Sequence, residues 1–199
     1  MIAALFVQPR GCYSKLSGVD PWPEKRDARL YRGNAPVVAH PPCARWCRLA
    51  GLVQARWGHR KGDDGGCFEF ALTTVRRVGG VLEHPAYSAA WERYGIPRPP
   101  RDGGWIPTPC GGWTCHVEQS KYGHPANKLT WLYAHGVQWL PELAWGSDPD
   151  RESKAMVSWC GNHTDRFDKR KRVGKGVASK TPLQFRNILL VMAVSAIRE

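Results

Sequence analysis

The sequence predicts an α/β fold in which one compact sheet is covered by helices on both faces. Short apolar runs, which are typical of buried strands, alternate along the chain with segments whose apolar residues recur at helical spacing. The chain has 199 residues, of which 42% are hydrophobic, so it is long enough for one domain with a core and too apolar to be disordered. Its 16 Pro and 21 Gly divide it into short elements.

The first half of the chain is expected to supply three strands and one helix. Residues 2–7 and 35–39 are apolar runs that end at proline-containing turns, so each predicts a strand. Residues 44–66 are rich in Gly and Arg and predict a mobile basic loop. Residues 67–78 carry apolar side chains on one helical face and end at two glycines, so they predict a helix, and residues 81–82 a short strand after it.

The second half is expected to continue the same alternation. Residues 85–94 favour a helix, and the Pro- and Gly-rich stretch 96–112 favours a loop. Strands are predicted at 114–119 and 129–134, and an apolar helical face predicts a final helix over 182–197.

This pattern predicts three parts in the chain. Residues 1–145 are expected to form a catalytic α/β domain. Residues 146–180 are polar and basic, and predict a basic loop or minimal recognition insert. Residues 181–199 are expected to form a C-terminal helix that packs back on the catalytic domain.

The charge of the chain is strongly positive. It contains 29 Lys and Arg against 17 Asp and Glu, a formal net charge of +12. Such a balance favours a polyanionic partner, and we expect DNA, with RNA as a possible alternative; a solvated charge run is the competing interpretation. The expected nucleic-acid-binding residues form two clusters: Arg45, Arg48, Arg56, Arg60 and Lys61 in the first, and Lys169, Arg170, Lys171 and Arg172 in the second.

The cysteines and the hydropathy pattern bear on location and metal binding. No apolar run approaches the roughly 20 residues of a membrane span, and the first residues lack a basic segment before a long apolar one, so we expect a cytoplasmic protein with free thiols and no membrane partner. No metal is expected, because the Cys pairs lack the spacing of two intervening residues that most strongly indicates zinc. A structural zinc site remains the alternative, with the candidate ligands Cys43, Cys47, Cys110, Cys115 and His116.

Two polar segments follow predicted strands, where active sites of α/β sheets lie. One is His40-Pro41-Pro42-Cys43 and the other begins at Glu83. A thiolate can add to the electron-poor C6 of a pyrimidine ring, and a carboxylic acid that protonates N3 lowers the barrier to this addition. The pair therefore predicts pyrimidine chemistry, with His40, Arg45 and Arg48 as the groups expected to lower the pKa of Cys43.

Three landmarks together resemble a known family. They are Pro41-Pro42-Cys43 after a strand, Gly79-Gly-Val-Leu-Glu-His-Pro85, and Tyr122-Gly-His-Pro125 before another strand. Their order and their separations of 40 and 39 residues resemble those of DNA cytosine-5 methyltransferases. The resemblance covers roughly residues 36–134 and implies a truncated Rossmann-like methyltransferase-type sheet. The chain's small size and basic charge suit a phage-type member.

The resemblance also implies a mechanism. Cys43 would attack C6 of a flipped base, and a one-carbon or related group would be transferred to C5. The other catalytic residues would be Glu83, His40, His84 and Lys128, where Lys128 is the one cation kept from an arginine-rich family segment. S-adenosylmethionine is the implied donor, although the Gly-rich turn that binds it in the family is largely absent here. The residues expected to hold it are Phe6, Gly11, Asp20 and Asp27.

Two further expectations concern nucleic acid. Trp46 and Trp57 lie in the basic loop and could stack on a flipped base or fill the gap that it leaves, or could instead pack against the domain edge. The alternative function is a non-catalytic DNA-binding protein on a degenerate methyltransferase-like scaffold.

Overall fold

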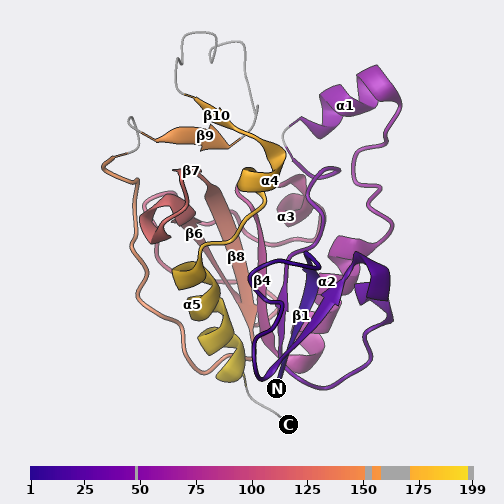
Figure 1. Ribbon diagram of the computed structural model, residues 1–199, viewed down its shortest axis with the longest axis vertical. Helices are drawn as coiled ribbons and strands as arrows, with labels where there is room; N and C mark the ends of the chain where they lie inside the picture. The colour runs from indigo at the N-terminus through magenta and orange to yellow at the C-terminus, as the bar shows by residue number, and fades with distance from the viewer. Residues whose placement is uncertain (48, 151–153, 158–170, 197–199) are drawn as a thin grey trace.

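A seven-stranded mixed sheet forms the centre of the protein. The computed structural model describes residues 1–47, 49–150, 154–157 and 171–196 (Figure 1). The strand order is β2-β1-β3-β4-β8-β6-β5, in which the first four strands are parallel and the last three pair antiparallel to their neighbours. The strands are β1 (Ile2–Val7), β2 (Val19–Pro23), β3 (Val37–Ala39), β4 (Gly80–Pro85), β5 (Ile106–Pro107), β6 (Trp113–Glu118) and β8 (Leu129–His135).

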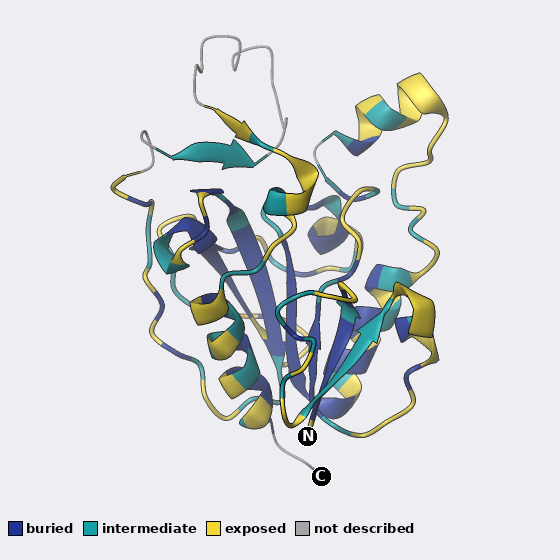
Figure 2. Ribbon diagram, viewed as in Figure 1, coloured by how far each residue is buried: buried dark blue, intermediate teal, exposed yellow. Residues whose placement is uncertain are grey.

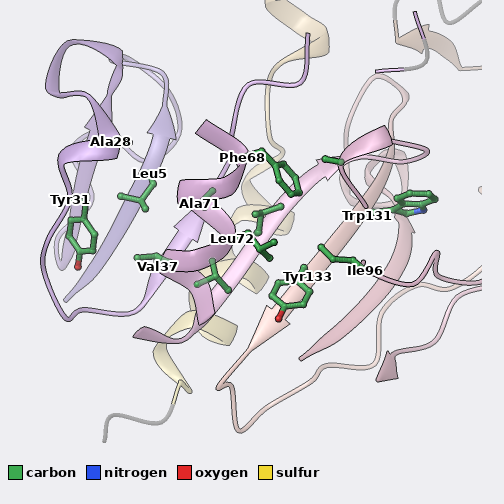
Figure 3. Packing of buried hydrophobic residues seen from close by; sticks show 14 of the residues in the cluster. Leu5, Ala28, Tyr31, Val37, Phe68, Ala71, Leu72, Ile96, Trp131 and Tyr133 are labelled. Carbon is green, nitrogen blue, oxygen red and sulfur yellow. The ribbon is translucent and has the colours of Figure 1, made fainter. Parts of the chain in front are cut away.

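Helix α2 (Cys67–Val78) covers one face of this sheet and has the predicted bounds. Its buried side chains, among them Phe68 and Leu72, join a core cluster with Leu5 and Val37 of the sheet (Figure 3). The chain returns from α2 directly into β4 through Gly80, whose φ is 131°. A Cβ at Gly80 would lie 2.0 Å from the carbonyl oxygen of Val37, so only glycine allows β3 and β4 to approach here.

Helix α5 (Leu183–Val194) covers the opposite face. Phe185 and Leu189 of the helix pack in a second cluster with Val38 and Leu132. Val37 and Val38 point to opposite faces because side chains alternate along a strand, which places the two helices on opposite sides. The expected α/β fold with helices on both faces is therefore present (Figure 1).

Several elements differ from the prediction. The expected loop over 44–66 contains helix α1 (Ala50–Trp57), in which only Ala50 is buried (Figure 2). The helix has no single apolar face, so hydrophobic periodicity does not reveal it. Strand β2 was not predicted because Asp and two Pro are unfavourable in strands; it is tolerated at the sheet edge, where it has one neighbour. The helix expected over 85–94 is the shorter α3 (Ala89–Arg93), capped by the Ser88 hydroxyl.

A second, three-stranded parallel sheet lies beyond one end of the main sheet (Figure 1). It consists of β7 (Ala126–Asn127), β9 (Ala155–Val157) and β10 (Arg172–Val173), and α4 (Lys175–Ala178) follows it. Strands this short leave no detectable period in the sequence. Among the residues described, no helix is both long and apolar enough to cross a membrane.

Candidate functional site

Glu83 is the centre of a buried hydrogen-bond network at the carboxyl end of β4. Its Oε2 lies 3.0 Å from Nδ1 of His40, the residue that follows β3. Its Oε1 accepts hydrogen bonds from Nε2 of Gln119 at 2.9 Å and from the Thr130 hydroxyl at 3.3 Å. The residue is 6% exposed, so these contacts replace most of its hydration.

Tyr13 extends the network behind His40. Its hydroxyl lies 2.9 Å from Nε2 of His40, and the residue comes from the loop after β1. Burial raises the pKa of Tyr13 well above its usual value of 10, so the hydroxyl keeps its proton. In a neutral His40 imidazole, Tyr13 therefore donates to Nε2 and the ring proton resides on Nδ1, where it is donated to Glu83.

The environment of Glu83 favours its ionised form. Burial alone would raise the pKa of Glu83, but the charge of Lys128 and the hydrogen bond from His40 outweigh it. The pKa of Glu83 falls from 4.5 to about 2. Glu83 is thus a carboxylate in the free protein at neutral pH, and it can act as an acid only after receiving a proton.

Cys43 lies in the exposed turn that follows His40-Pro41-Pro42. Desolvation of the thiol raises the pKa of Cys43 to about 11, and the negative charge of Glu83 is the second cause. The residue is nevertheless exposed to solvent, so this desolvation of its thiol is incomplete. The expected lowering of this pKa is wrong for the free protein: burial and the charge of Glu83 outweigh the nearby charge of Lys128, and Arg48 lies outside the described residues.

His84 does not join Glu83 in the network. Adjacent residues on a strand face opposite sides of the sheet, and His84 points into the cluster beneath α2. It is fully buried, with its ring centroid 5.1 Å from that of Phe68 and 6.1 Å from that of Trp91. Burial lowers the pKa of His84 to about 4, so the ring is neutral at pH 7. The expectation of a direct catalytic role is corrected: His84 is a core residue.

Lys128 lies near Glu83, as the sequence suggests. Its ammonium group donates a hydrogen bond to the carbonyl of Lys180 at 2.9 Å, and its charge lowers the pKa of Glu83. Tyr13, Gln119 and Thr130 were not predicted as site residues. Thr130 could have been found from strand register, because it lies diagonally across from Glu83 on the neighbouring strand.

The residues expected to hold S-adenosylmethionine do not form one site. Phe6 lies at the carboxyl end of β1. Asp20 lies near the opposite end of the paired strands, because it is opposite Ala3 and about 10 Å before the end of β2. The Asp20 carboxylate is bonded by neighbouring side chains, and Asp27 is paired with Arg29. Gly11 lies in a tight turn, where a Cβ would lie 3.1 Å from Cβ of Gln8. The four residues therefore do not fit this donor, and no chemical step is assigned to it.

Both basic clusters project beyond the same end of the sheet, the end that carries Glu83 (Figure 1). Helix α1 and the loops on both sides of it bear the first cluster, and the described residues of the second, Lys171 and Arg172, lie at β10 of the second sheet. All described members except the half-buried Arg45 are exposed: Arg56, Arg60, Lys61, Lys171 and Arg172. Lys169 and Arg170 lie outside the described residues.

The two tryptophans of the first basic segment have different environments. Trp46 is 4% exposed, packs against Phe68 and Tyr94, and donates a hydrogen bond to Asp64 at 2.8 Å. It is therefore a core residue here rather than a free stacking group. Trp57, at the end of α1, is 59% exposed and remains available for contact with a base.

A cleft of about 700 Å³ lies beside α3, lined by Trp46, Tyr94 and a mixture of acidic and basic side chains. Neither Cys43 nor Glu83 lines it. Its acidic residues, which include Asp63 and Glu69, oppose the basic Arg60 and Lys61, so the cleft presents no single charge to a ligand. We therefore place the candidate site at Glu83, where the convergent polar groups lie, rather than in this cleft.

Neither a metal-binding cluster among the described residues nor a known relative identifies a further function for the site. Within the described part of the chain, no three His, Cys, Asp or Glu side chains are grouped so as to hold a metal ion. Comparison with protein-family models, curated proteins and solved structures finds no match to this chain.

Proposed function

We propose that this protein is an enzyme that modifies a pyrimidine base in nucleic acid, similar in mechanism to DNA cytosine-5 methyltransferases. The observation that carries the proposal is the position of Cys43 and Glu83. They lie at the carboxyl ends of the adjacent parallel strands β3 and β4, close enough for the charge of Glu83 to raise the pKa of the Cys43 thiol. A soft nucleophile and a carboxyl group at one edge of the sheet are the minimum set for attack on the ring.

The proposal also covers the fold type and the partner. The parallel strands, the helices on both faces and the site at the carboxyl ends support a truncated Rossmann-like methyltransferase-type sheet. Two exposed basic clusters flank the site end and support DNA as the partner, with RNA as the alternative. An enzyme of this kind would act in the cytoplasm.

In the proposed mechanism the base is first rotated out of its stack, because C6 is inaccessible within a duplex. The Cys43 thiolate adds to C6 while Glu83 delivers a proton to N3, which leaves an enamine whose nucleophilic carbon is C5. C5 then bonds to the incoming group and loses its hydrogen as a proton. Departure of sulfur from C6 and return of the N3 proton restore the ring. The chemical class of the donor is left open.

Hydrogen exchange at C5 tests this mechanism without any donor. The enamine carbon accepts a deuteron from heavy water, and elimination of Cys43 then releases a base labelled at C5. We expect the protein to label cytosine in an oligonucleotide, the Cys43→Ala variant to be inactive, and Cys110→Ala, which removes another exposed thiol, to retain activity. Equal labelling by the wild type and Cys43→Ala would refute nucleophilic attack by this residue.

A binding function is the second candidate. The raised pKa of Cys43 and the scattered donor-binding residues favour a DNA-binding protein on a degenerate scaffold. This function predicts salt-dependent DNA binding, no labelling at C5, and unchanged nucleosides in cells that express the protein. Nucleoside mass spectrometry of such cells, compared with cells that express Cys43→Ala, separates the two functions. A new pyrimidine mass that depends on Cys43 would exclude the binding function.

A further inference from the structure

The site contains a proton source that the resemblance to methyltransferases does not supply. Glu83 must carry a proton to N3 of the base, yet its pKa of about 2 leaves it ionised at neutral pH. The group in contact with it that can hold a proton is His40, 3.0 Å from Oε2. A protonated imidazole beside a carboxylate stores one proton that can move to the carboxylate when the base arrives.

We propose that His40 is a positioning residue that supplies this proton: it passes the proton through Glu83 to N3, and Tyr13 supports both charge states of its ring. This inference rests on the proposed base-modifying function. The transfer moves the proton from Nδ1 of His40 to Oε2 of Glu83 and from the Glu83 carboxyl group to N3, while the sulfur–C6 bond forms. The elimination step returns the proton along the same path, so no other reactant is consumed.

The geometry explains why Tyr13 is part of the relay. A tyrosine hydroxyl both donates and accepts, so it can bond Nε2 when this atom is bare and again when it carries a proton. Tyr13 is 2% exposed and its hydroxyl lies 2.9 Å from Nε2, so water is largely excluded from this contact. Without the hydroxyl, a protonated His40 ring would have an unpaired, partly buried N–H, which disfavours the protonated form.

The second carboxylate oxygen is held independently of His40. Gln119 and Thr130 both donate to Oε1, so the carboxylate keeps its orientation when the proton on Oε2 moves. Other titratable and charged groups surround the pair and enter any pH dependence. They are Cys12 in the loop before Tyr13, Cys43 in the turn after His40, His84 on β4, Lys128 before β8 and Arg186 on α5.

The pH profile of C5 labelling tests the relay. Labelling by the wild type needs both a proton on His40 and an ionised Cys43, two requirements that change in opposite directions with pH, so its rate should rise with pH and then level off. In His40→Gln, an amide can keep both hydrogen bonds but carries no proton to transfer. We expect this variant to be at least about 100-fold slower at low pH, with unchanged KM for the oligonucleotide. The labelling rate of His40→Gln should keep rising toward pH 11, so the difference between its rate and that of the wild type becomes smaller as pH increases.

Tyr13→Phe is the second variant, and it keeps the test decisive if His40→Gln does not fold. It should destabilise the protonated ring and shift the levelling of the profile to lower pH. The matched controls are His135→Gln, at the far end of β8, and Tyr31→Phe, which packs against Trp22 of β2. Both should retain the wild-type profile.

The outcomes separate the relay from the function on which it rests. Absence of labelling by the wild type would refute the proposed function itself. If the wild type labels C5 but the profile of His40→Gln runs parallel to it at every pH, the relay is wrong. A Tyr13→Phe profile that levels off at the wild-type pH would likewise overturn the role of the hydroxyl.

Discussion

Replacement of Glu83 by Gln should remove a large pH-dependent contribution to stability. The pKa of Glu83 falls from 4.5 to about 2 in the folded protein, and each unit of this fall corresponds to about 1.4 kcal/mol of stability. The ionised carboxylate therefore contributes about 3 kcal/mol to the free energy of unfolding at pH 7. Because the folded pKa is the lower one, this contribution is complete above pH 4.5 and is lost as pH falls toward 2. Gln has the same size, so little of the loss should arise from packing.

Urea unfolding between pH 2.5 and 7 measures this contribution. We expect Glu83→Gln to be about 3 kcal/mol less stable than the wild type at pH 7, with the two curves converging toward the acid end. Glu92→Gln is the control, because Glu92 forms an exposed ion pair with Arg98 and should change stability by less than about 1 kcal/mol. A constant difference between Glu83→Gln and the wild type at all pH values would contradict the electrostatic account.

Three other predictions concern the thiol, the start of α2 and the basic surface. The rate of Cys43 alkylation by iodoacetamide, followed by peptide mass spectrometry, should increase about tenfold per pH unit and level off only near pH 11. A rate that is constant from below pH 8 would show that the thiol is activated. Asp64→Ala should lower the free energy of unfolding, measured in urea, by about 1–3 kcal/mol. The reason is that the Asp64 carboxylate accepts hydrogen bonds from the Trp46 indole and from the Phe68 amide, both at 2.8 Å. An unchanged urea midpoint of unfolding would exclude this role. Lys171→Ala should reduce the slope of log affinity for DNA against log salt by about 0.9, whereas an unchanged slope would mean that this side chain contacts no phosphate.

Local patterns in the sequence were sufficient for most of the main sheet and for both covering helices. Helix α2 was predicted with its observed bounds, since the spacing of its apolar residues and the glycines that follow it indicate the same helix. Strands β1, β6 and β8 were predicted to within a residue at each end. Elements whose residues lack a period, such as α1 and β2, were missed because tertiary contacts or backbone hydrogen bonds alone maintain them.

The sequence by itself identified Cys43, Glu83 and His40 as candidates, since polar residues placed after apolar strands indicate a site at the sheet edge, and the family resemblance added Lys128. Whether these residues meet, and in which charge state, was decided only by the tertiary structure. The charge of Lys128 and the hydrogen bond from His40 make Glu83 a carboxylate, whereas burial and the charge of Glu83 raise the pKa of Cys43. The alternation of side chains along β4 turns His84 into the core. Tyr13 lies 27 residues from His40 and belongs to no motif, so only the folding of β1 beside β3 makes it a site residue.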